Sequence, residues 1–130
     1  NSEAYKREHM DSVLFFCGNK SVVWKGENMD MDFKVIDNYL MIKMPAEVDH
    51  HLAGTICRKA DAFLMNDKVS NIVFDFEETK FMDSSGIGII VGRYKKISYL
   101  GGKVFAVHVD SQIRRILYIS GLNKMIEVLD

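Results

Sequence analysis

The chain of 130 residues has little cysteine, little proline and no dominant charge. Its two cysteines, Cys17 and Cys57, stand far apart without CxxC spacing, so neither a disulfide framework nor a zinc site is supported, and reduced thiols are expected. Seventeen basic residues against eighteen acidic ones leave a formal net charge of -1. Such a balance provides no large positive field for nucleic acid or an anionic membrane, so neither is an expected partner.

The sequence also lacks a membrane-spanning segment. The apolar run 87–91 is interrupted by Gly88 and is far too short to cross a bilayer, and the charged N-terminus lacks the apolar core of a signal peptide. We therefore expect a soluble, cytoplasmic protein. With 48% hydrophobic residues and one proline, the chain suits a single compact domain with a sizeable core.

Hydrophobic periodicity predicts an α/β fold with a mixed β-sheet. Alternating residues at about 31–36 and 39–44, joined by the tight turn Asp37-Asn38, predict an antiparallel hairpin at the start of the sheet. Further strands are expected at about 72–76, 103–109 and 125–128, and helices at about 50–65, 85–100 and 111–119. Because strands and helices alternate after the hairpin, we expect a layered sheet and helix architecture with right-handed crossovers.

Polar and glycine residues mark the ends of the predicted helices. Asp49 is the expected N-cap of the first helix, whose residues Arg58, Lys59 and Asp61 lie on the face opposite its apolar stripe. Gly101-Gly102 is expected to end the second helix, and Gly121 the third.

The segment 81–88, with the sequence FMDSSGIG, lies where a buried strand is followed by a helix. It places serine hydroxyls at a helix N-terminus, where free N–H groups and the helix dipole favour an added phosphate. A phosphorylation switch is therefore physically reasonable. Gly86, Gly88 and Gly92 cost the helix stability relative to alanine, so we expect the sheet or a partner to approach this backbone closely.

Three separated motifs resemble one known family. Residues 81–97 (FMDSSGIGIIVGRYKKI), 46–51 (AEVDHH) and 119–122 (ISGL) are similar to the bacterial anti-anti-sigma factors of the STAS class, particularly the sporulation anti-sigma-F factor antagonists. The resemblance covers about residues 31–129 in collinear order, which is more specific than one glycine pattern. It implies the STAS fold, a mixed β-sheet that starts with an antiparallel hairpin and is packed with helices.

The resemblance implies a regulatory protein with no catalytic activity and no cofactor. Its unphosphorylated form would bind an anti-sigma factor with serine kinase activity and release a sporulation sigma factor. Phosphorylation would inactivate the antagonist, and a PP2C-type phosphatase would reverse the mark. The alternatives are a STAS antagonist in a general stress sigma-factor pathway and, ranked below it, a small nucleotide-binding module.

Ser85 is the predicted phosphoacceptor, because it matches the second serine of the family's Asp-Ser-Ser-Gly motif. The alternative is that Ser84 and Ser85 only cap the helix. A side chain at Gly86 is expected to stand between Ser85 and a partner, so Gly86→Ala is expected to preserve stability and weaken binding. The resemblance implies partner-binding roles for Asp49, His50, Asp83, Ser84, Ser85, Gly86, Ile87 and Gly88, with the Asp49 loop near Ser85.

Neither a metal site nor an enzyme active site is predicted. His50 and His51 are expected to point to different sides of the helix, with solvated side chains as the alternative to a binding role. The third glycine of a dinucleotide fingerprint is replaced by Val91, and Asp83 stands where a serine hydrolase has glycine. His108 is the only histidine after the serines, and no acid and base pair is marked by sequence.

Two parts of the chain are expected. Residues 29–130 form the STAS domain, without the helix that family members carry after the last strand. Either that helix is missing from the sequence given, or Val128 and Leu129 leave an apolar edge uncovered. Residues 1–28 have no counterpart in the family. One alternative is that residues 13–17 and 21–24 form an added hairpin on a sheet edge. The other is that the segment is not native, because the codons for 25–28 can contain a ribosome-binding sequence ahead of a translation start at Met29.

Overall fold

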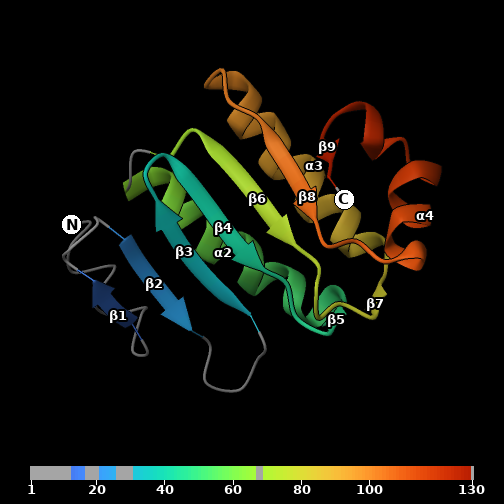
Figure 1. Cartoon of the computed structure of the whole chain (residues 1–130), viewed down its shortest axis with the longest axis horizontal. Coiled ribbons are helices and arrows are strands. Elements are labelled where there is room, and N and C mark those ends of the chain that lie inside the picture. Colours follow the sequence, from blue (N-terminus) through green and yellow to red (C-terminus); the bar gives the residue numbers. More distant parts are fainter. Residues whose placement is uncertain (1–12, 17–20, 26–30, 67–68, 130) are drawn as a thin grey trace.

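The computed structural model describes residues 13–16, 21–25, 31–66 and 69–129 (Figure 1). Its main sheet has seven strands in the order β1-β2-β3-β4-β6-β8-β9. Pairing is antiparallel from β1 to β4 and parallel from β4 to β9, which confirms the mixed sheet. The strands are β1 (Val13–Phe16), β2 (Ser21–Lys25), β3 (Asp32–Ile36), β4 (Tyr39–Lys43), β6 (Asn71–Asp75), β8 (Val104–Val107) and β9 (Glu127–Val128).

The predicted hairpin is formed by β3 and β4. Ile36 pairs with Tyr39, so Asp37 and Asn38 alone make the turn, and Asp37 has the positive φ of 54° that such two-residue turns require. The main-chain carbonyl of Asn38 accepts hydrogen bonds from the N–H groups of Ser70 and Asn71, at 2.9 and 3.1 Å. These bonds fix the turn against the start of β6 and help to set the register of the parallel part of the sheet.

The backbones of β1 and β2 form a second hairpin that pairs with β3. This agrees with the added-hairpin interpretation of residues 13–16 and 21–24, while Cys17 and the connection 18–20 lie outside the described residues. The origin of residues 1–28 stays a prediction.

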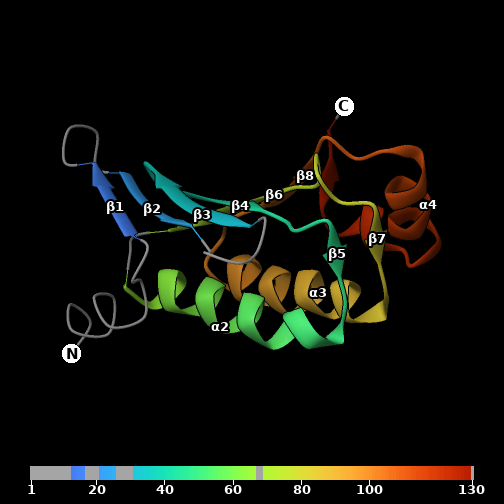
Figure 2. The same cartoon turned by 90° about the horizontal axis from the view of Figure 1, so that it is seen from below.

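Two helices, α2 (His50–Asn66) and α3 (Ser84–Tyr99), lie side by side on one face of the sheet (Figure 2). The sheet residues that face them are buried, because alternate positions of β3 and β4 point inward. The rings of Phe33 on β3 and Phe63 on α2 stack with centroids 5.7 Å apart. The core therefore lies between this face and the two helices.

The last elements of the chain are strand β8, helix α4 (Ser111–Ile119), a 3-10 turn at Leu122–Lys124, and strand β9. The helix matches the prediction, but both strands are shorter than predicted. β8 ends at Val107 because His108 adopts a positive φ of 55°, and the 3-10 turn leaves only Glu127–Val128 for β9. Leu129 is 44% exposed and Val128 is partly buried.

Gly101 and Gly102 end α3, as predicted. Gly101 has a φ of 82°, and the N–H of Gly102 donates to the carbonyl of Ile97 at 2.9 Å. A Cβ atom on Gly102 would overlap the main-chain oxygen of Ser70, so the chain passes this point only without a side chain.

The contact between α2 and α3 includes an ion pair of Asp61, a residue that the sequence pattern placed on the opposite, solvated face of α2. Asp61 was expected on the solvated face of α2, but its Oδ1 lies 3.1 Å from Nε of Arg93 and its Oδ2 lies 2.9 Å from Nζ of Lys96. The Arg93 side chain is only 9% exposed. Its Nε–H is not aligned on Oδ1 as a hydrogen bond, and the described residues offer Nη1 no acceptor, so charge attraction carries the contact.

We expect Asp61→Ala to lower the free energy of unfolding by about 1–3 kcal/mol, because it leaves the buried Arg93 charge with no acid beside it. Urea unfolding followed by circular dichroism measures this. The matched control is Glu78→Ala, which removes the partner of Lys43 from a pair whose side chains are 38% and 51% exposed. That change should stay within about 0.5 kcal/mol. Equal losses in the two variants would contradict the structural role of Asp61.

Gly86 faces the interior, which overturns the expectation that a side chain there would face a partner. A Cβ atom on Gly86 would overlap Cγ of Met82 and would lie 3.2 Å from Cγ1 of Val48, both buried residues. A Cβ atom on Gly88 or Gly92 would meet no described atom within 4 Å. Among the described residues, a close approach from within the protein therefore occurs at Gly86 and not at Gly88 or Gly92, and at Gly86 it comes from the protein's own core. Approach of a partner to Gly88 or Gly92 stays a prediction.

The expected stability of Gly86→Ala is reversed accordingly. Displacing Met82 costs about 1–3 kcal/mol, against a gain of up to about 1 kcal/mol in helix propensity, so the variant should be destabilised. Gly88→Ala, two residues further along the same helix, should instead be stabilised by up to about 1 kcal/mol. Thermal unfolding of both variants against the parent checks the difference. A Gly86→Ala protein at least as stable as the parent would contradict this packing.

Candidate functional site

A small second sheet, missed by sequence patterning, brings two helix N-termini together. Strand β5 (Glu47–Val48) leads into α2, strand β7 (Phe81–Met82) leads into α3, and the two strands pair in parallel. The N–H of Asp83 donates to the carbonyl of Val48 at 3.0 Å. The buried Thr79 hydroxyl donates to the carbonyl of Pro45 at 2.9 Å, which fixes the segment that precedes β7. The Asp49 loop therefore lies beside the serine loop, as predicted.

Both helices that start here are capped by an aspartate. Asp83 is the N-cap of α3, and its Oδ1 accepts a hydrogen bond from the N–H of Ser85 at 2.8 Å. The Oδ1 of Asp49 accepts from the N–H groups of His51 and Leu52 at 3.0 and 3.2 Å, which confirms the predicted cap of α2. The alternative in which the serines themselves cap α3 is wrong, because the helix starts at Ser84, after its Asp83 cap.

The predicted site residues differ in exposure. Ser84, Gly88 and His50 are exposed, while Asp49, Asp83, Ser85 and Ile87 are half-buried, and Gly86 is buried. Ile87 packs against the core. Phe81, which was quoted in the motif without a role, is 46% exposed beside the serine loop. Strand alternation is the signal that could have found it, since Met82 points inward and Phe81 must then point outward.

The electrostatics of the serine loop are set by its caps. Ser85 lies in the first turn of α3, where the helix dipole favours negative charge. The Asp83 carboxylate already accepts the Ser85 N–H, and the Asp49 carboxylate caps the neighbouring helix. A phosphate on Ser85 would therefore add its charge beside the Asp83 carboxylate, with a second carboxylate at the start of the neighbouring helix.

The prediction for the adjacent histidines is wrong in its geometry. The rings of His50 and His51 do not point to different sides of α2, because their centroids are only 4.0 Å apart with an angle of 37° between the ring planes. Two rings supply at most two strong ligands at the exposed start of a helix. Among the described residues, a group of three side chains that could hold a metal ion occurs elsewhere.

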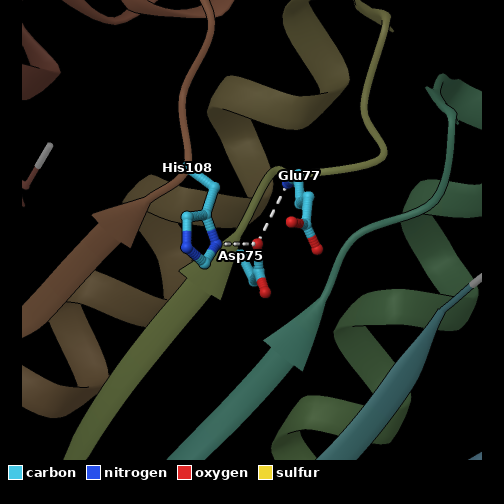
Figure 3. A group of neighbouring side chains, drawn as sticks. All are labelled: Asp75, Glu77 and His108. Atoms are coloured by element: carbon cyan, nitrogen blue, oxygen red, sulfur yellow. Dashed lines mark hydrogen bonds and ion pairs between the residues drawn. The ribbon is translucent and has the colours of Figure 1, made fainter.

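That group consists of Asp75, Glu77 and His108 (Figure 3). The Nδ1 of His108 lies 2.9 Å from the Oδ1 of Asp75, and the same oxygen accepts a hydrogen bond from the N–H of Glu77 at 3.0 Å. The hydrogen bond to Asp75 and the charge of that carboxylate raise the pKa of the His108 imidazole above its ordinary value, and Glu77 adds to this effect. Sequence reasoning left His108 without a role because Asp75 is 33 positions away.

The remaining sequence expectations concern thiols and membranes. Cys57 on α2 is half-buried and unpaired, and Cys17 lies outside the described residues. Within the described ranges, no helix is both long enough and apolar enough to cross a membrane.

With the geometry described, the chain can be compared with known proteins. It matches the STAS domain family over residues 30–130. It is 31% identical to an anti-sigma F factor antagonist of Paenibacillus polymyxa over 103 residues, which cover 79% of this chain and 88% of that protein. It is also 30% identical to an anti-sigma F factor antagonist of Lysinibacillus sphaericus over 83 residues, covering 64% and 71% of the two chains.

Solved structures agree with this assignment at the level of the fold. The anti-sigma factor antagonist SpoIIAA in its unphosphorylated form has a TM-score of 0.66 and 23% identity, over 77% of this chain and 87% of that chain. The phosphorylated form of Bacillus SpoIIAA has a TM-score of 0.64 and 25% identity, over 77% and 91%. The STAS fold expected from the three motifs is therefore confirmed, and the chain belongs to the STAS domain family, where its relatives include proteins named anti-sigma factor antagonists.

Proposed function

We propose that this protein is an anti-sigma factor antagonist switched by phosphorylation on Ser85. In the unphosphorylated form it binds an anti-sigma factor that is also a serine kinase, and a sporulation sigma factor is released. A PP2C-type phosphatase restores the active form, and the antagonist itself catalyses no reaction. The observation that carries the proposal is the β5 and β7 pairing, which places the start of α2 beside the Asp-Ser-Ser-Gly loop on one surface.

The relatives support this assignment. The two that share 31% and 30% identity are named anti-sigma F factor antagonists, and solved structures exist for both a phosphorylated and an unphosphorylated form of SpoIIAA. The Asp83 cap also leaves the serine hydroxyls without a role in starting α3, so the loop can carry a modified serine while the cap stays in place.

The proposed switch works by charge at the docking surface. Phosphorylation adds about −1.5 to −2 charges at neutral pH, next to the Asp83 carboxylate and on the surface that also carries the Asp49 cap of α2. A partner that accommodates these two carboxylates would meet a much larger negative charge, and its docking would be blocked. The fold should persist, since the first turn of a helix tolerates an anion.

A general stress sigma-factor pathway is the second candidate. The observation that favours it is 23% identity over 101 residues to the anti-sigma-B factor antagonist of Bacillus subtilis. Binding to a purified sporulation-type anti-sigma kinase, compared with an anti-sigma-B factor under the same conditions, separates the two pathways. Preference for the anti-sigma-B factor would move the protein to the stress pathway.

The phosphoacceptor can be identified with two neighbouring substitutions. When the protein is mixed with its cognate kinase and ATP, Ser85→Ala should abolish labelling, while Ser84→Ala should retain much of it. Ser84 is the more exposed of the two, so simple accessibility would predict the opposite order. Intact mass and peptide mapping read out the site. Full labelling of the Ser85→Ala protein would refute the assignment.

Ser85→Asp separates a switch from a structural residue. It places one negative charge in the first turn of α3, so we expect kinase binding to weaken about tenfold or more while the thermal midpoint stays near that of the parent. The matched control is Ser111→Asp, which adds the same charge in the first turn of α4, also behind an aspartate cap. The control should bind normally. Loss of folding in Ser85→Asp would instead make the serine structural.

A further inference from the structure

Two adjacent parallel strands end at the group formed by Asp75, Glu77 and His108. Asp75 is the last residue of β6 and pairs with Val107, the last residue of β8, so His108 follows directly on the neighbouring strand. Glu77 follows Asp75 by two residues, and its side chain lies beside those of Asp75 and His108 (Figure 3). The three side chains are 33 positions apart at most, yet one ligand atom from each lies within 4.8 Å of the others.

The spacing of the donor atoms suits a metal ion. Nδ1 of His108 and Oδ1 of Asp75 are 2.9 Å apart. Two ligands of a tetrahedral zinc ion, each about 2.0–2.1 Å from the metal, lie about 3.4 Å from one another. The pair would therefore have to separate by only about 0.5 Å to hold such an ion. The Glu77 side chain is exposed and completes the set by turning about its own bonds.

The backbone holds the first ligand in place. The N–H of Glu77 donates to Oδ1 of Asp75 at 3.0 Å, and the N–H of Phe76 donates to the carbonyl of Val107 at 3.0 Å, which ties the two strand ends together. Hydrogen bonds from the surrounding protein to the ligating side chains orient metal ligands in this way. The His108 side chain is 57% exposed, so solvent can fill the remaining coordination positions.

We propose that Asp75, Glu77 and His108 form a binding site for one divalent transition-metal ion, of which Zn²⁺ fits the donors best. One imidazole nitrogen with two carboxylate oxygens is a set that zinc accepts, whereas Mg²⁺ and Ca²⁺ prefer oxygen ligands alone. Where Nδ1 carries a proton toward Asp75, that proton leaves to solvent as the metal binds. The site shares no residue with the proposed partner-binding surface and does not depend on the proposed function.

The simpler explanation of this group is a surface ion pair between His108 and Asp75, with no metal ion. It accounts for the 2.9 Å contact and leaves Glu77 only a weak effect of its charge on His108, not a ligand role. The two interpretations therefore differ in what they expect of Glu77, and the experiment is designed around that residue.

Calorimetric titration of the chelator-treated chain with ZnCl₂ tests the site. We expect one Zn²⁺ per chain, and we expect Asp75→Asn, Glu77→Gln and His108→Gln each to weaken binding about tenfold or more. The matched control is the double variant His50→Gln/His51→Gln, which removes two exposed histidines and should bind like the parent. Binding of Mg²⁺ should be far weaker. Circular dichroism on every variant confirms that it is folded, and amide shifts on zinc addition should centre on residues 75–77 and 108.

Three outcomes would overturn the proposal. They are no binding up to millimolar zinc, binding that only the His50 and His51 control removes, and binding that survives His108→Gln. Parent-like binding by Glu77→Gln would overturn it as well, because zinc would then need only Asp75 and His108.

Discussion

The surface at the start of α2 and α3 depends on a contact only two residues long. Val48 and Met82 pair across β5 and β7, and the Val48 carbonyl also accepts the N–H of Asp83. Each strand runs directly into a helix, so this pairing fixes both helix starts at once. The buried Thr79 hydroxyl, bonded to the Pro45 carbonyl, holds the approach to β7 in the same way. Without these bonds, nothing local in sequence would bring Asp49 and Ser85 to one surface.

Much of the fold could be predicted from the sequence because its signals are local. Alternation gave the β3 and β4 hairpin, Asp49 marked the start of α2, and Gly101-Gly102 marked the end of α3. The strands that were predicted too long show where local signals stop. β8 ends where His108 adopts a positive φ, a conformation that the residue type does not predict. The 3-10 turn shortens β9.

The interactions that sequence could not supply are those between elements. Periodicity puts Asp61 on the polar side of α2, which is correct for an isolated helix and wrong once Arg93 of α3 lies against it. Gly86 shows the same limit of sequence analysis. A glycine after the serines is equally consistent with the close approach of a partner and with close packing in the core. The side chains of Met82 and Val48 beside Gly86 show that the close packing is with the core. At the site, the sequence therefore located the loop, whereas the direction in which each residue faces came from packing.

The aspartate caps also constrain how a phosphate could act. A helix N-terminus with open N–H groups would attract a phosphate and could fold around it. Here the Asp83 carboxylate already accepts the Ser85 N–H, and Asp49 occupies the start of α2 in the same way. A phosphate on Ser85 would thus find the Ser85 N–H already bonded and the Asp83 carboxylate beside it, so it should extend outward from the surface. If Ser85 is the phosphorylated residue, a phosphate in that position would change what can dock there more than it would change the fold beneath it.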